Sequence, residues 1–94
     1  MTTTTTRFQL GRILATPGAL RAMQEAEESP LRLLKRHAHG DFGNLHDDDV
    51  RANELAIRRD MRVLSAYVLT TDERVWVITE ADRSATTILL PEEY

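Results

Sequence analysis

Three histidines and a run of aspartates lie close together in the sequence and could bind a metal ion. They are His37, His39, His46 and the aspartates at 47–49. Zinc needs three or four such ligands converging at about 2.0–2.2 Å. His37 and His39 are two positions apart, a spacing that converges on a strand and diverges on a helix. Because the segment is predicted to be a helix end, we expect neither a metal site nor a cofactor.

The same stretch has a structural interpretation. His37 lies near the end of a predicted helix, where the helix dipole favours a protonated imidazole. The aspartates at 47–49 would begin the next helix, where negative charge is stabilised. Phe42, in the turn GDFG, is predicted to fill the core.

A second polar group lies in the stretch TEADRS at 79–84. Together with the first stretch it could bind or activate a ligand, provided that the two turns approach within hydrogen-bond reach. The alternative is a solvated turn, in which Asp82 accepts backbone N–H groups and Arg83 pairs with a nearby acid. The candidates for ligand or partner binding are His37, Asp41, Phe42, Glu80, Asp82 and Arg83. No residue is expected to be catalytic, because the chain has no cysteine, no Ser/His/Asp order and no glycine-rich loop.

Charge is unevenly distributed along the 94 residues, whose formal net charge is −3. The first forty residues are basic and the rest acidic, but neither part has the strongly basic face of a typical nucleic-acid binder. The candidate phosphate contacts are Arg12, Arg21, Arg32, Lys35 and Arg36, with Arg7 beside them. The alternative is that these residues form a solvated helical face.

The chain has no segment that predicts a membrane span or a secretory signal. It contains no run of about 18 apolar residues, and its start, MTTTTTRF, has no apolar core. We expect a cytoplasmic protein with a disordered tail at 1–7 and a single α+β domain at 8–94.

The elements expected to position these residues begin with helices. Leu10, Ile13 and Leu14 have helical spacing, which then breaks. Thr-Pro at 16–17 and Ser-Pro at 29–30 predict helices over about 17–27 and 30–38, and a third helix follows over about 46–60. This third helix has one apolar stripe, formed by Leu45, Ala52, Leu55 and Ala56. Because Val50 and Ile57 lie on roughly the opposite side, the helix is expected to make a second contact.

Strands are predicted after residue 61, where β-branched and aromatic residues become frequent. We place them at about 62–70, 74–80 and 85–90. The predicted fold is therefore α+β, with three short N-terminal helices followed by a three-stranded antiparallel β-meander. Alternation leaves both sheet faces substantially apolar, which three short helices can hardly cover. The sequence thus predicts a homodimer, with the second sheet face or an edge strand at the contact.

Four stretches carry a resemblance to a known family. They read LGRILATPGAL, RHAHGDFG, RVLSAYVL and VWVITEADRSATTILLPEEY. These stretches resemble a family of small bacterial proteins of unknown function, carried on plasmids and integrated mobile elements, over about residues 8–94. The family's turn usually reads R-H-x-x-G-D-W-G. The residues that match it are Arg36, His37, Gly40, Asp41 and Gly43, while Phe42 stands where tryptophan is usual.

Members of that family are sometimes labelled as a modification subunit of type I restriction systems. A methyltransferase needs a Rossmann-like sheet with a glycine-rich cofactor turn, and this sequence has neither. The resemblance implies a context, that of an accessory protein of mobile DNA. The small size, the lack of a catalytic constellation and the surplus apolar surface favour a non-catalytic module that acts by protein–protein binding and modulates host defence or plasmid maintenance. A nucleic-acid-associated regulator is the alternative, followed by a small metal-binding protein or enzyme.

Overall fold

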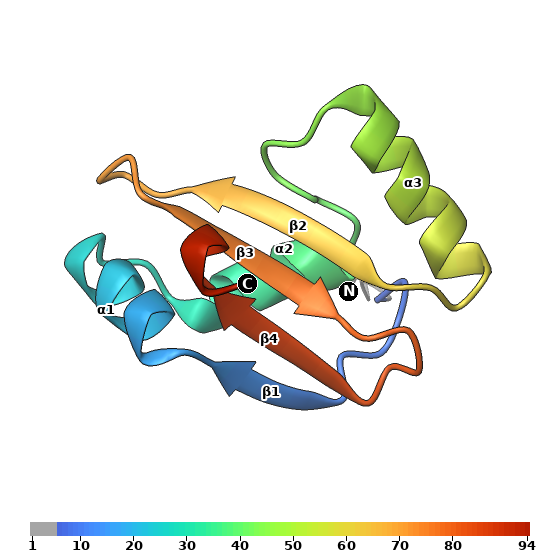
Figure 1. Cartoon of the computed structure of the whole chain (residues 1–94), viewed down its shortest axis with the longest axis horizontal. Helices are drawn as coiled ribbons and strands as arrows, with labels where there is room; N and C mark the ends of the chain where they lie inside the picture. Colours follow the sequence, from blue (N-terminus) through green and yellow to red (C-terminus); the bar gives the residue numbers. More distant parts are fainter. Residues whose placement is uncertain (1–5) are drawn as a thin grey trace, which may run out of the picture.

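Three helices and a four-stranded mixed sheet make up the structure of residues 6–94 in the computed structural model (Figure 1). The elements, in chain order, are β1 (Arg12–Ala15), α1 (Pro17–Glu25), α2 (Pro30–Ala38), α3 (Asp47–Arg58), β2 (Val63–Val68), β3 (Arg74–Thr79), β4 (Ala85–Leu89) and the 3₁₀ turn η1 (Pro91–Glu93). None of the helices in this part of the chain is long and apolar enough to cross a membrane.

The predicted fold of three N-terminal helices followed by a three-stranded meander is wrong. A strand precedes the helices, and the order across the sheet is β1-β4-β3-β2. β2, β3 and β4 pair antiparallel, whereas β1 is parallel to β4, with Arg12 opposite Ala85 and Ala15 opposite Ile88.

Local geometry explains why residues 12–15 are extended although Leu10, Ile13 and Leu14 have helical spacing. Gly11, at φ +66°, reverses the chain just before the strand, and a Cβ there would meet the Ser84 backbone at 2.4 Å. At the other end, Thr16 precedes a proline and is extended, as residues before proline prefer to be. Between these two positions only four residues remain, too few for periodicity to distinguish a strand from a helix.

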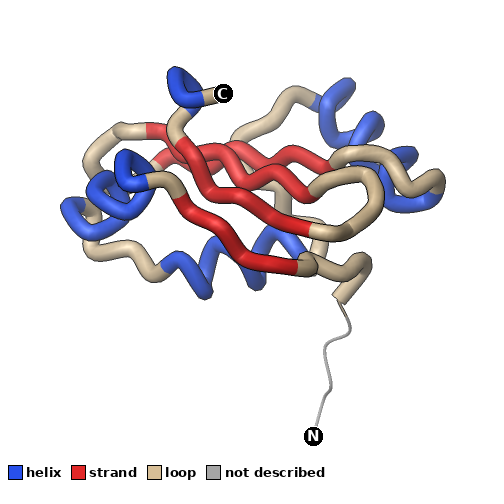
Figure 2. The backbone as a smooth tube through the Cα atoms, turned by 60° about the horizontal axis from the view of Figure 1, so that its bottom comes forward, coloured by secondary structure: helices blue, strands red, loops and turns tan. Residues whose placement is uncertain are grey.

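The helices cover the two sheet faces unequally. α1 and α2 lie against one face, the inner face, while η1 lies in front of the other, the outer face, and α3 lies beside β2 (Figures 1 and 2). The main core fills the space between α1, α2 and the inner face. Its largest fully buried members are Tyr67, Met23, Leu33, Ile88, Val75 and Val77.

The predicted helix starts at 17 and 30 are confirmed, but the Ser29 side chain makes no capping hydrogen bond. The Thr16 hydroxyl accepts the N–H of Ala19 at 3.1 Å, with Pro17 in the first turn. The aspartates at 47–49 occupy the first turn of α3. Of the predicted disordered tail, residues 1–5 lie outside the described part of the chain. Arg7 is part of the fold, because its N–H donates to the carbonyl of Ala38 and its guanidinium binds Glu54.

A second apolar cluster fixes α3 against the sheet. Phe42 is buried in it with Phe8, Ala56 and Val63, which confirms that Phe42 fills the core. Val50 and Ile57, which were expected to make a second contact, pack on this same cluster together with Leu45. Leu55, which the sequence assigned to the apolar stripe, is exposed instead.

Asn53 joins α3 to the edge of β2 through two hydrogen bonds. Its amide donates to the carbonyl of Leu64 at 2.7 Å and its Oδ1 accepts the N–H of Leu64 at 3.1 Å.

Asn53→Ala is expected to lower the free energy of unfolding by about 1–3 kcal/mol, because two partly buried backbone groups lose their partners. Urea unfolding measures this loss. Arg51→Ala, at an exposed position of the same helix, should change the free energy of unfolding by less than about 0.5 kcal/mol. Equal losses for both variants would show that Asn53 does not stabilise the contact between α3 and β2.

Candidate functional site

His37 is the most deeply buried of the predicted site residues. Its side chain is fully buried between α2 and the inner sheet face. The imidazole Nδ1 lies 2.6 Å from the Ser65 hydroxyl of β2, and Nε2 lies 2.8 Å from the Thr79 hydroxyl of β3. The edge of the Phe8 ring packs against the imidazole, with ring centroids 5.1 Å apart.

The protons in this buried chain of polar groups have one consistent arrangement. Thr86 donates its hydroxyl proton to the carbonyl of Leu10 at 2.7 Å. Its oxygen therefore accepts from Thr79, 2.7 Å away, because each hydroxyl has one proton to donate. Thr79 in turn accepts from His37 Nε2–H. A neutral imidazole then has its proton on Nε2 and accepts the Ser65 hydroxyl proton at Nδ1.

The surroundings of His37 also favour the neutral form. Burial, with a smaller contribution from the positive charge of Arg83, lowers the pKa of His37 from 6.5 to about 4. The prediction of a protonated histidine stabilised by the helix dipole is therefore wrong. The cost of placing a charge in the apolar core exceeds what the end of a short helix can offset.

The two predicted turns, at 36–43 and 79–84, meet through a buried contact, because His37 Nε2 lies 2.8 Å from the Thr79 hydroxyl. The half-buried Arg83 reaches the Phe8 ring, which also packs against His37, and its guanidinium lies 5.6 Å from the ring centroid. The acidic residues of the turns have separate partners. Asp41 binds Arg36 at 2.7 Å, the N–H of Ser84 donates to Asp82 at 3.0 Å, and Glu80 lies 3.6 Å from Arg62. These carboxylates do not form one site with His37.

Arg83 supports the fold. The sequence suggested that it pairs with a nearby acid, but its guanidinium binds carbonyl oxygens instead. It donates to Met61 at 2.7 Å and to Ala56, in the last turn of α3, at 3.1 Å. A positive charge is favourable at a helix C-terminus, so Arg83 ties the end of α3 to the turn before β4.

The histidines and acids of residues 6–94 do not gather into a metal site. No group of three or more His, Asp or Glu side chains in this range is placed to hold a metal ion. His39 instead directs Nδ1 to the carbonyl of Lys35, 2.7 Å away, while His46 precedes the first turn of α3.

Most of the basic candidates for phosphate binding already have acidic partners. Arg21 pairs with Glu25 and Glu73, Arg32 pairs with Glu28, and Arg36 pairs with Asp41. Arg12 and Lys35 have no ion pair within residues 6–94. Arg21, Arg32 and Arg36 would therefore have to exchange a carboxylate partner before they could bind a phosphate.

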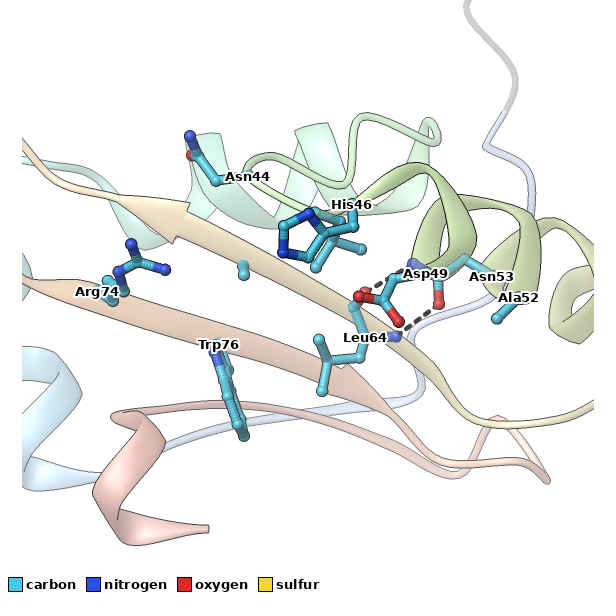
Figure 3. Close-up of a pocket in the computed structure, with 10 residues that line it drawn as sticks. Asn44, His46, Asp49, Ala52, Asn53, Leu64, Arg74 and Trp76 are labelled. Carbon is cyan, nitrogen blue, oxygen red and sulfur yellow. Dashed lines mark hydrogen bonds between the residues drawn. The ribbon is translucent and has the colours of Figure 1, made fainter.

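A groove that the sequence did not predict lies between α3 and the outer face of the sheet (Figure 3). Its volume is about 430 Å³. The lining residues are Asn44, Leu45, His46, Asp49, Ala52, Asn53, Leu64, Ala66, Arg74 and Trp76. The only signal for it in the sequence was the second apolar face of the strands, which includes Leu64, Ala66 and Trp76.

The groove combines an apolar surface with opposite charges at its sides. The Trp76 side chain projects from β3 and is stacked edge-on against Tyr94, with centroids 5.7 Å apart. Arg74, on β3, is exposed and has no ion pair within the described residues. Asp49 lies on α3, across β2 from Arg74 (Figure 3). An aromatic surface with a free guanidinium suits a segment that carries an apolar and an acidic side chain.

Comparisons with protein-family models, with curated proteins and with solved structures found no match for this chain.

Proposed function

We propose that this protein is a non-catalytic protein-binding module that works as a homodimer, and that the groove beside α3 receives its partner. The groove carries the proposal, because it joins an apolar surface around Trp76 to the guanidinium of Arg74, which has no ion pair within residues 6–94. The partner would present a segment with an apolar side chain for the groove and a carboxylate for Arg74.

The resemblance to proteins of mobile elements supplies the proposed setting. In that setting the protein is an accessory of mobile DNA and modulates host defence or plasmid maintenance through the bound partner. The arrangement of the titratable groups agrees with a binding role, because His37 is buried and the predicted acids have separate partners.

Substitution in the groove tests the proposal. Candidate partners are captured from an extract of a bacterial host and identified, and each is purified and titrated against the protein. Arg74→Glu is expected to weaken binding of the true partner at least tenfold, because it places a negative charge opposite the partner's carboxylate. Arg59→Glu makes the same charge change at an exposed position just after α3 and should leave the affinity unchanged.

Two results would overturn the proposal. One is a partner whose affinity is equally insensitive to both variants. The other is retardation of DNA or RNA at low salt that is lost when Arg12 and Lys35 are replaced by glutamine, which would establish the nucleic-acid-associated alternative.

A further inference from the structure

The edge strand β1 is open along the side that faces away from β4. It is the outermost strand of the sheet, and no element of residues 6–94 pairs with that side (Figure 1). Ile13 is 48% exposed and Leu14 is 42% exposed. The opposite edge strand, β2, already has partners at two of its residues, because Ala66 exchanges hydrogen bonds with Phe42 and Asn44, and Asn53 binds Leu64. An open edge with apolar side chains is a template for pairing with another strand.

Alternation along β1 determines which backbone groups are available. The N–H of Arg12 donates to Ser84 and the N–H of Thr16 donates to Ile88. Every second residue of a strand directs its backbone groups to the same side, so residues 12, 14 and 16 face β4. Ile13 and Ala15 therefore direct their N–H and C=O groups to the open side.

We propose that two copies of this chain pair antiparallel along β1, about a two-fold axis that passes through Leu14. The proposal rests on the homodimer proposed above and assigns its contact. In this register Ile13 of each copy lies opposite Ala15 of the other, and both pairs exchange their N–H and C=O groups. Shifting the axis to Ala15 would bring Pro17, which has no N–H, opposite Ile13. Shifting it to Ile13 would pair Ala15 with Gly11, where the chain leaves the strand.

Side-chain chemistry supports this register on the outer face. Leu14 would meet Leu14 of the second copy directly, at the close spacing of a non-hydrogen-bonded pair. Arg12 would lie opposite Thr16 of the second copy. The Thr16 hydroxyl already donates to the carboxylate of Glu93 at 2.6 Å. Arg12 has no ion pair within residues 6–94. In the dimer it would reach Glu93 of the second copy, and the two-fold axis would repeat this ion pair at the other end of the contact.

The inner face provides apolar surface for the same contact. Ile13 lines a groove with Leu10, Leu31, Leu34 and Ala38 of the neighbouring loop and α2. Leu31 is 62% exposed there. A two-fold axis brings this surface of both copies to the same side of the sheet, which is the usual way in which a small protein covers such a patch.

The mass of the purified protein in solution tests the dimer and its contact. Light scattering is expected to give twice the 10.7 kDa mass of the chain at micromolar concentration. Leu14→Glu should reduce the mass to that of the monomer, because two carboxylates would meet at the axis. Val68→Glu is the matched control, since Val68 is 40% exposed on the other edge strand, and this variant should remain a dimer. Circular dichroism establishes that both variants are folded.

A second variant tests the backbone contact. Ile13→Pro removes an N–H that faces away from β4, so it should abolish the dimer and keep the β1–β4 pairing. A wild-type protein of 10.7 kDa would overturn both the homodimer and this contact. A wild-type dimer that survives Leu14→Glu and Ile13→Pro, or is lost with Val68→Glu, would overturn the contact alone.

The proposed ion pair has its own readout. Arg12→Gln and Glu93→Gln should each raise the dimer dissociation constant several-fold, and the double variant should be no weaker than either single variant. Additive losses would show that the two side chains do not meet, and would overturn the register.

Discussion

Gly43→Ala is expected to lower the free energy of unfolding by about 2–5 kcal/mol, the sum of a left-handed backbone penalty and overpacking. Gly43 has φ +75°, and a Cβ there would lie 2.1 Å from the carbonyl oxygen of Ala66 and 2.6 Å from the Tyr67 ring. Neither neighbour can withdraw, because Ala66 belongs to β2 and Tyr67 is fully buried. Thermal or urea unfolding measures the loss.

Gly40→Ala is the matched control for this substitution. Gly40 has φ +89°, but a Cβ there would meet only the side chain of Arg7, which is half-exposed and flexible, rather than backbone or a buried ring. We expect Gly40→Ala to cost about 1–2 kcal/mol, the backbone penalty alone. Equal losses for the two variants would show that the contact of Gly43 with β2 contributes nothing.

Acidification from pH 7 to pH 5 is expected to lower the free energy of unfolding by about 2 kcal/mol through His37 alone. The unfolded chain takes up a proton near pH 6.5, whereas burial keeps the pKa of His37 at about 4 in the folded protein. Between these values the unfolded state binds more protons, so stability falls as pH falls, by about 1.4 kcal/mol per pH unit. The loss should level off below pH 4.

His37→Gln isolates this effect, because a glutamine amide supplies a donor and an acceptor without titrating. The variant should be less stable than the wild type at pH 7 and should lose about 2 kcal/mol less on acidification to pH 5. The carboxyl groups of Asp41, Glu54 and Glu93, whose pKa values are lowered by hydrogen bonds from Arg36, Arg7 and Thr16 respectively, remain in both proteins. Parallel pH profiles would contradict the assignment to His37.

Local features of the fold could be predicted from the sequence because short-range chemistry determines them. Thr16 and Pro17 specify a helix start whatever lies around them, and the aspartates at 47–49 match the dipole of the helix that they begin. The three later strands were also predicted, at about 62–70, 74–80 and 85–90, against observed bounds of Val63–Val68, Arg74–Thr79 and Ala85–Leu89. Phe42 was recognised as a core residue because it is the one large apolar side chain in a polar turn.

Features that depend on distant partners could not be predicted in the same way. Leu10, Ile13 and Leu14 have the spacing of a helix, and pairing with β4 makes residues 12–15 a strand. The state of His37 depends on Ser65 and Thr79, 28 and 42 positions away. The groove exists because Asn53 fixes α3 beside Leu64, and a single asparagine in a helix carries no periodic signal.

The pairing of β1 with β4 also has a consequence for biosynthesis. The Leu10 carbonyl, just before β1, receives its hydrogen bond from Thr86, 76 positions later. Ribosomes add about 5–20 residues per second, so the first strand waits on the order of 4–15 s for its neighbour in the nascent chain. During this time both of its edges are open, and Ile13 and Leu14 are available to any chaperone at the ribosome exit. Slow translation before residue 85 prolongs this vulnerable period.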